Sequence, residues 1–314
     1  MLPPIPLVTR LNGEEEQAWL DVLRRAMPDE RILPFAELEP EERRLAEIAI
    51  VANPDPADVA ALPGLSFIHS LWAGVERLVM ELGVTAPPIV RLVDPELSRV
   101  MAEAVLAWTY YLQRDMPAYR YSQSNKQWAP RDYRHPGEVA VGLLGLGALG
   151  TESAARLTQA GFRVEGWSRS QKTLDNVVTH HGEDGLKTLL SSSDILVCLL
   201  PLTAETRGLL NAERLARMPQ GTALINFARG AVVVSDDLIA ALDSGHLDHA
   251  VLDVFEQEPL GESSPFWAHP KVTVLPHISA PTTPVTAARI VAANIASWRA
   301  SGTLPQTVNR QRGY

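Results

Sequence analysis

The chain of 314 residues contains a single cysteine, Cys198, so no intrachain disulfide can form. A protein without disulfides suits a reducing compartment, and we therefore expect it in the cytoplasm. Cys198 lies in the apolar run Ile195–Leu200. In such a run we expect a buried strand residue rather than a catalytic thiol.

Long apolar runs and basic clusters are also missing. No stretch of about 18 uninterrupted apolar residues occurs, so we expect no membrane-spanning helix. Prolines occupy positions 3, 4 and 6 with no basic segment before them, which does not resemble a signal peptide. The formal net charge is −9, which argues against nucleic acid or an anionic membrane as a partner. No metal site is expected.

The remaining composition is that of a globular protein with room for two domains. Hydrophobic residues make up 46% and charged residues 21% of the chain. Before Asp94-Pro95, short apolar runs alternate with helix-like stretches, which predicts a parallel βαβ sheet. The expected strands of this part are Ile5–Val8, Arg31–Phe35, Ile48–Ala52, Phe67–Leu71 and Ile89–Val93.

A second alternating part follows a helix predicted over Arg99–Gln113 by its apolar periodicity. Between them, residues 114–136 are polar and aromatic and are expected to form an arm that docks on a partner subunit. We expect Asn211 and Ser235 to cap helices, the first ending at Gly221, and a last helix over Thr286–Ala300. The expected strands are Val139–Leu144, Phe162–Trp167, Asp194–Leu200, Ala223–Phe227, Ala250–Val254 and Val272–Leu275.

A glycine-rich turn follows the first strand of this second part. It reads Gly145-Leu146-Gly147-Ala148-Leu149-Gly150 and precedes a helical segment and a second strand, the setting of a dinucleotide-binding fingerprint. The free amides at the helix start then bind the phosphates. For this motif alone, a methyltransferase that uses S-adenosylmethionine is the main alternative.

The residues after the second strand indicate which dinucleotide is bound. NAD enzymes usually carry an acidic residue there, which binds the ribose hydroxyls. This chain instead reads Trp167-Ser168-Arg169-Ser170-Gln171-Lys172, without an acid. The planar fork of Arg169 suits a 2′-phosphate. We therefore predict NADP(H) in preference to NAD(H).

Three polar residues follow three separate strands behind the turn. They are Arg229, Glu258 and His277. Ligands of open parallel sheets bind at the carboxyl ends of the strands, so these side chains are expected to converge. A cation, a carboxylate and an imidazole can together bind an anionic substrate and protonate its carbonyl oxygen.

Four motifs together resemble the signatures of the D-2-hydroxyacid dehydrogenases over essentially the whole chain. They are Gly145-x-Gly-x-x-Gly, Asn226-x-Ala-Arg-Gly, Asp253-Val-Phe-x-x-Glu-Pro and Pro276-His277. Within that family the chain most resembles glyoxylate/hydroxypyruvate reductase A. This narrower similarity rests on Trp167-Ser-Arg-Ser, Asn125-x-x-Trp128 and Arg312-Gly313-Tyr314.

The resemblance implies an α/β fold in which a Rossmann-type doubly wound domain is inserted into a smaller flavodoxin-like βα domain. The substrate domain would contain residues 1–96 and 286–314, and the dinucleotide domain residues 97–285. Arg229, Glu258 and His277 would be catalytic, with His277 as proton donor. Trp72, Ala73, Gly74 and Arg229 would bind the substrate carboxylate, although Gly74-Val75-Glu76 departs mildly from the Gly-Val-Asp of many relatives.

The activity implied is NADPH-dependent reduction of glyoxylate to glycolate and of hydroxypyruvate to D-glycerate by a cytoplasmic homodimer. Another D-2-hydroxyacid dehydrogenase, acting on phosphoglycerate or a bulkier 2-keto acid, is an alternative. A non-enzymatic NAD(P)H-sensing regulator is another. The residues expected to contact the cofactor are Gly145, Leu146, Gly147, Ala148, Leu149, Gly150, Trp167, Ser168, Arg169, Ser170, Lys172, Leu200, Pro201, Thr206, Phe227, Ala228 and Asp253.

Overall fold

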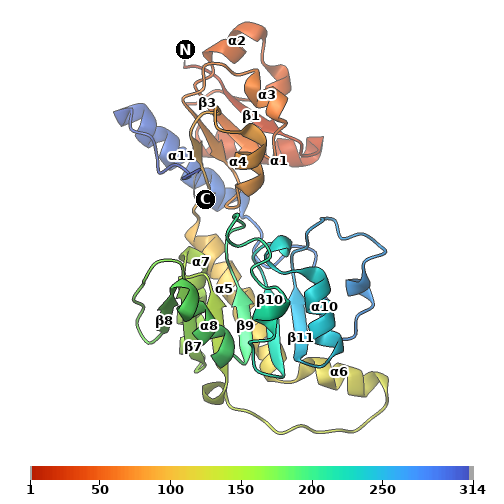
Figure 1. Cartoon of the computed structure of the whole chain (residues 1–314). Coiled ribbons are helices and arrows are strands. Elements are labelled where there is room, and N and C mark those ends of the chain that lie inside the picture. Colours follow the sequence, from red (N-terminus) through yellow and green to blue (C-terminus); the bar gives the residue numbers. More distant parts are fainter. Residues whose placement is uncertain (1, 311–314) are drawn as a thin grey trace. The chain divides into compact units, whose positions relative to one another are not determined.

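The structure is a computed structural model that describes residues 2–310, and it divides into two compact units (Figure 1). The terminal unit contains the residues up to Glu96 and those from Thr282 onward; the central unit contains Leu97–Pro281. The return into the terminal unit thus comes before the expected position 286. Helix α11 (Pro284–Ser301) already packs there from its first turn, where Thr286 donates to Asp94 at 2.6 Å. Arg312-Gly313-Tyr314 lies outside the described residues.

The terminal unit contains a five-stranded sheet whose paired strands are all parallel. The strand order is β2 (Ile32–Pro34), β1 (Ile5–Thr9), β3 (Ile48–Ala52), β4 (Phe67–Ser70) and β5 (Ile89–Val90). Strands β2, β4 and β5 are shorter than the sequence predicted. Beyond β5, the amide of Val308 donates to the carbonyl of Ile89 at 2.7 Å, so the end of the chain pairs with this sheet edge.

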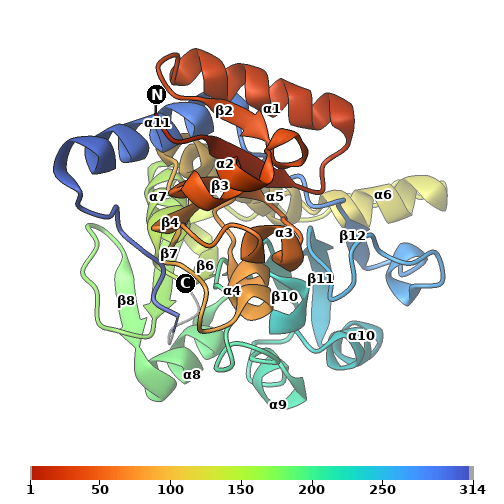
Figure 2. The ribbon, with the colours of Figure 1, turned by 90° about the horizontal axis from the view of Figure 1, so that it is seen from above.

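Helices cover both faces of this sheet. On one face, α1 (Gly13–Ala26) lies beside α11, and both bury apolar side chains in one cluster with the sheet (Figure 2). The opposite face buries Val59 of α3 (Pro56–Ala60) and Leu78 of α4 (Glu76–Leu82). The short helix α2 (Pro40–Leu45) and the 3-10 turn η1 (Phe35–Glu37) precede β3.

The central unit contains a seven-stranded sheet, again with parallel pairing throughout. Because the strands are parallel, their carboxyl ends meet at one edge, which is where the candidate site residues follow the strands. The strand order is β12 (Val272–Val274), β11 (Leu247–Leu252), β10 (Thr222–Asn226), β9 (Ile195–Cys198), β6 (Ala140–Leu144), β7 (Arg163–Ser168) and β8 (Val178–His181).

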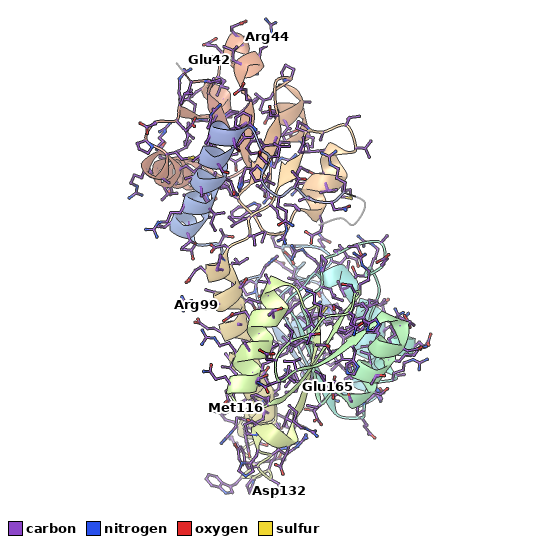
Figure 3. The ribbon with its side chains drawn as sticks, turned by 90° about the vertical axis from the view of Figure 1, so that its left-hand side faces the viewer. Glu42, Arg44, Arg99, Met116, Asp132 and Glu165 are labelled. Atoms are coloured by element: carbon purple, nitrogen blue, oxygen red, sulfur yellow. The ribbon has the colours of Figure 1, made fainter. Side chains whose placement is uncertain are left out.

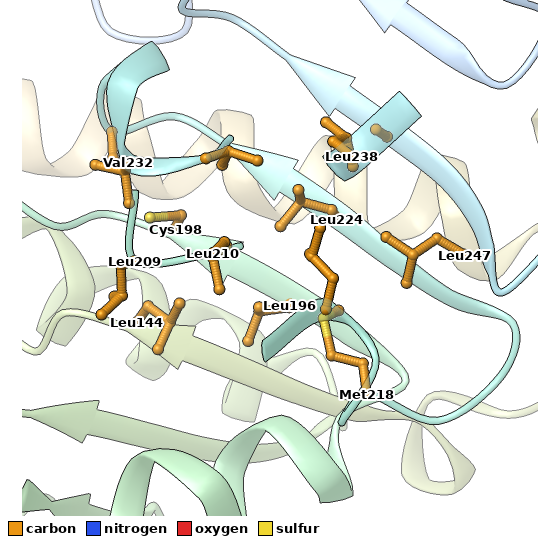
Figure 4. Packing of buried hydrophobic residues seen from close by; sticks show 14 of the residues in the cluster. Leu144, Leu196, Cys198, Leu209, Leu210, Met218, Leu224, Val232, Leu238 and Leu247 are labelled. Carbon is orange, nitrogen blue, oxygen red and sulfur yellow. The ribbon is translucent and has the colours of Figure 1, made fainter. Parts of the chain in front are cut away.

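Two apolar clusters hold this sheet between helices. One face packs against α8 (Gly182–Ser192), α9 (Ala212–Leu215) and α10 (Ser235–Asp243), and Cys198 is fully buried in that cluster (Figure 4). Burial raises the pKa of the Cys198 thiol to about 12, so the expected inert strand residue is confirmed. The other face packs against α5 (Pro95–Gln113) and α7 (Ala148–Gln159).

Residues 114–136 contain a helix that the sequence did not predict. Helix α6 (Met116–Ser124) follows α5 directly, and the chain then runs without regular structure to the 3-10 turn η2 (Pro136–Glu138). Met116 and Asp132, labelled in Figure 3, lie on this segment. Its aromatic side chains are exposed, and that of Trp128 is 98% exposed. Among residues 2–310, no helix is long and apolar enough to cross a membrane.

Three further sequence expectations were wrong in detail. Helix α5 starts at Pro95 and not at the expected Arg99, because Asp94 accepts a hydrogen bond from the amide of Glu96 at 2.8 Å and Pro95 suits the first helical position. Asn211 caps α9 as expected, but the helix ends at Leu215; it could not run on to Gly221, since Pro219 disfavours helical backbone at Met218. Ser235 is the first residue of α10 and makes no side-chain cap.

We predict that Gly150→Ala destabilises the central unit. A Cβ at position 150 would lie 1.8 Å from the carbonyl oxygen of Gly145, whereas a Cβ at Gly147 would meet no atom within 4 Å. Overpacking of this kind costs about 1–3 kcal/mol. The urea midpoint of unfolding of the cofactor-free protein should therefore fall clearly in Gly150→Ala and less in the control Gly147→Ala. A wild-type midpoint for Gly150→Ala would contradict this packing.

Candidate functional site

The glycine turn joins β6 to α7 with the backbone geometry that a dinucleotide requires. Gly145 has a φ of +106°, which side-chain-bearing residues rarely adopt. Gly150 brings α7 against the carbonyl of Gly145, and Gly147 faces open space. Free amides at the start of a helix and an approachable backbone suit a pyrophosphate. The residues present therefore fit the phosphate groups of the expected cofactor.

The loop after β7 lies against this turn. The ammonium of Lys172 donates to the carbonyl of Leu146 within the turn, so it braces the loop. Ser168 donates to the carbonyl of Ser170 at 2.7 Å, and the indole of Trp167 donates to Gly182 at 2.8 Å. These contacts hold the expected cofactor segment against the glycine turn and the start of α8.

Arg169 of this loop forms an ion pair that the sequence did not reveal. Its Nη1 lies 3.0 Å from Oε2 of Glu205, which belongs to the loop after β9. In that loop, buried Thr206 donates to the carbonyl of Pro201 at 2.7 Å. The expected cofactor residues Arg169, Pro201 and Thr206 thus come from loops after β7 and β9, the strands on either side of β6.

The turn that carries Arg229 is closed by the side chain of Asn226, the last residue of β10. Its amide donates to the carbonyl of Arg229 at 3.1 Å, and its oxygen accepts from the amide of Ala228 at 3.2 Å. Gly230 then starts the 3-10 turn η3 (Gly230–Val232), where a Cβ would lie 2.0 Å from the backbone carbon of Phe255. The Arg229 turn and the Phe255 segment are therefore in direct backbone contact.

Glu258 links that segment to His277. One of its carboxylate oxygens accepts from the amide of Phe255 at 2.9 Å, and the other lies 2.7 Å from Nδ1 of His277. The expected convergence of Glu258 and His277 is thus present in the geometry. The hydrogen bond at Nδ1 leaves the second ring nitrogen, Nε2, for contact with a substrate.

Asp253, directly after β11, holds the backbone that follows His277. Its buried carboxylate accepts from the amides of Ile278 at 2.7 Å and Ser279 at 2.9 Å. His277 itself has a φ of +55°, in the left-handed region, so its orientation depends on this anchor. The expected cofactor contact of Asp253 stays a prediction, and the positioning of His277 is a task that the sequence did not indicate.

The charges around His277 favour its protonated form. The hydrogen bond from Glu258 raises the pKa of His277, partial burial opposes this, and the Glu258 charge outweighs the nearby positive charge of Arg229. Burial alone would raise the pKa of Glu258, but bonds from His277 and the Phe255 amide bring it below its usual value. The surroundings of the pair therefore favour the imidazolium–carboxylate form.

The three residues expected on the substrate side, Trp72, Ala73 and Gly74, lie on the loop after β4 in the terminal unit. The amide of Trp72 donates to Oγ of Ser70 at 3.0 Å, and the carbonyl of Trp72 accepts from Leu92. Trp72 and Gly74 line a cavity of this unit together with Asn53. No group of three His, Cys, Asp or Glu side chains within residues 2–310 is arranged to hold a metal ion.

Comparison with known proteins places the chain among the dehydrogenases. Residues 106–279 match the family model of the D-isomer specific 2-hydroxyacid dehydrogenase, NAD binding domain. A D-isomer specific 2-hydroxyacid dehydrogenase from Xanthobacter autotrophicus Py2, solved with NADPH and MES, is 40% identical. Its structure superposes with a TM-score of 0.91, and the match covers 98% of this chain and 99% of that one.

Two further solved structures are similar over nearly the full length. The NADPH-dependent glyoxylate/hydroxypyruvate reductase of Sinorhizobium meliloti, in complex with NADP and sulfate, is 33% identical, with a TM-score of 0.88 and 99% of each chain covered. A D-isomer specific 2-hydroxyacid dehydrogenase family protein from Klebsiella pneumoniae 342 is 35% identical, with a TM-score of 0.88 and 98% and 97% covered. The chain is an oxidoreductase with an NAD-binding domain. It belongs to the D-isomer specific 2-hydroxyacid dehydrogenase family.

We predict that Glu258→Gln lowers the pKa of His277. The amide removes the negative charge beside Nδ1, while the positive charge of Arg229 remains. NMR titration of the His277 imidazole should show a pKa above the ordinary 6.5 in the wild type and a lower value in the variant. The chemical shifts of His269, which pairs with Asp243 elsewhere in the unit, serve as a reference for the fold. An unchanged His277 titration would show that Glu258 does not control its charge.

Proposed function

We propose that this protein reduces small 2-keto acids with NADPH, converting glyoxylate to glycolate and hydroxypyruvate to D-glycerate. The observation that carries the proposal is the His277–Glu258 pair with Arg229 nearby, in a family of 2-hydroxyacid dehydrogenases. The similarity to the Sinorhizobium meliloti reductase supports the choice of substrate. Glyoxylate and hydroxypyruvate are two particular substrates within the 2-hydroxyacid dehydrogenase reaction of the family.

In this mechanism the chain's own residues bind the acid and supply the proton. Arg229 provides a cation for the anionic substrate, and backbone amides near Gly74 bind its carboxylate. His277 donates the proton on Nε2 to the carbonyl oxygen, because Nδ1 is hydrogen-bonded to Glu258. Glu258 stabilises the imidazolium before that transfer. After the transfer His277 is a neutral imidazole. When bound, NADPH supplies the hydride that C2 accepts, so hydride and proton together give the 2-hydroxy acid.

His277→Gln tests this role directly. The glutamine cannot act as an acid, so turnover of glyoxylate should fall by about 10²–10⁴-fold, the usual contribution of a positioned acid. NADPH binding should be unchanged because the glycine turn is intact. The matched control is His269→Gln, since His269 also pairs with a carboxylate, that of Asp243 at 3.2 Å. Turnover near the wild-type rate in His277→Gln would remove the residue from the mechanism.

The choice of acid needs a separate measurement. We expect kcat/KM to be highest for glyoxylate and hydroxypyruvate in a panel that includes phosphohydroxypyruvate and branched 2-keto acids. A preference for a phosphorylated or bulkier acid would contradict the proposed substrates and leave the family reaction intact. No turnover of any acid would instead favour a regulator that senses the dinucleotide.

We propose NADPH over NADH because Trp167–Lys172, directly after β7, contains Arg169 and no acid that could bind the ribose hydroxyls. Two similar proteins were solved with NADPH or NADP. A charge-assisted hydrogen bond contributes about 1.5–3 kcal/mol, or roughly ten- to more than a hundredfold in binding. We therefore expect at least a tenfold preference in kcat/KM.

Arg169→Asp should remove that preference. It replaces the cation with a charge that repels the 2′-phosphate, so NADPH affinity should fall at least tenfold while NADH affinity changes little. Arg217→Asp is the control, because Arg217 also pairs with an exposed glutamate, Glu213. Equal use of both cofactors by the wild type, or an Arg169→Asp enzyme that still prefers NADPH, would refute this reading.

We also propose that the protein acts as a homodimer in the cytoplasm, with residues 114–136 as the arm between subunits. The exposed aromatic side chains of Tyr121, Trp128 and Tyr133 support it. Light scattering at micromolar concentration should give the mass of two chains. Trp128→Ala should weaken the dimer at least tenfold, unlike the exposed control Trp267→Ala. A wild-type monomer would contradict the arm.

A further inference from the structure

The ion pair between Arg169 and Glu205 brings together two loops from opposite sides of the glycine turn. Arg169 follows β7 and Glu205 follows β9, and these strands flank β6, which leads into the turn. Lys172 ties the first loop to the turn through the carbonyl of Leu146. A carboxylate therefore lies beside the cation on which the preference for a phosphorylated cofactor rests.

The backbone around Glu205 is held in a defined turn. Thr203 accepts from the amide of Arg207 at 3.0 Å, and its own amide donates to the hydroxyl of Thr206 at 2.8 Å. The Glu205 side chain is 69% exposed and that of Arg169 is 44% exposed. The backbone bonds thus fix the turn that carries Glu205, and the ion pair itself is partly exposed to water.

We propose that Glu205 competes with the 2′-phosphate of NADPH for Arg169 and so limits the preference of the enzyme for NADPH. This inference rests on the proposed use of NADPH. A phosphate monoester carries about −1.5 to −2 charges at pH 7 and draws on the same guanidinium, whose Nη1 already contacts the Glu205 carboxylate. Binding of the phosphate must displace Glu205 or place two anions side by side.

NADH responds differently because it carries a hydroxyl at the same position. A hydroxyl is neutral, so it neither competes for the cation nor is repelled by the carboxylate. Glu205 therefore weakens NADPH binding but does not weaken NADH binding, because a carboxylate can accept a hydrogen bond from a ribose hydroxyl. The opposite role, in which Glu205 orients Arg169 for the phosphate, is disfavoured because an exposed ion pair constrains its partners only weakly.

The test compares wild type with Glu205→Gln as full-length proteins. Dissociation constants for NADPH and NADH are measured by nicotinamide fluorescence, and adenosine 2′-monophosphate is titrated by calorimetry as a probe without the nicotinamide. Exposed ion pairs are weak, so removing the competitor should tighten NADPH and the 2′-phosphate probe about two- to fivefold. NADH binding should not tighten. The gain should shrink at high ionic strength, because the interaction is between exposed charges.

The matched control is Glu213→Gln, which removes another exposed glutamate paired with an arginine, Arg217, in the same unit. It should leave all three constants unchanged. Unchanged or weaker NADPH binding in Glu205→Gln would overturn the competition, and weaker binding would assign Glu205 to the orientation of Arg169. If wild type and Arg169→Asp bind NADPH equally, the proposed cofactor site itself fails, and the inference falls with it.

Discussion

The candidate site depends on backbone contacts that join the turns after three neighbouring strands, β10, β11 and β12. Gly230 lies against the backbone of Phe255, where no side chain would fit. Asp253 accepts two amides from the segment after His277, and Glu258 completes the link through the imidazole. Because each turn is fixed by the next, a small change in one backbone contact would misplace a side chain of another turn.

The same arrangement sets the charge balance of the site. The positive charge of Arg229 lowers the pKa of His277, and Glu258 raises it. The effect of the Glu258 carboxylate is larger because it is hydrogen-bonded to the ring. A bound 2-keto acid would therefore reduce the influence of Arg229 and favour the imidazolium further, so substrate binding and protonation would support each other.

Much of the fold could be predicted because buried parallel strands appear as short apolar runs between helices. Strand β8 was missed because Val178–His181 sits at the sheet edge and shows no apolar pattern. Helix α6 was missed because its stretch is polar and none of its residues is buried. The glycine turn and the Arg229, Glu258 and His277 motifs were visible in the sequence. The roles of Asp253 in positioning His277 and of Glu205 beside Arg169 were not, because they depend on contacts between separate loops.

The central claim is that His277, kept protonated by Glu258, is the acid of the reaction. Its most direct test is the pH dependence of kcat/KM for glyoxylate reduction and for glycolate oxidation by the same enzyme. Reduction needs the imidazolium and should be lost as the pH rises through the pKa of free-enzyme His277, while oxidation needs the neutral ring and should be gained through the same pKa. In Glu258→Gln both transitions should move together to lower pH. Transitions that differ between the two directions, or that stay in place in the variant, would contradict the account.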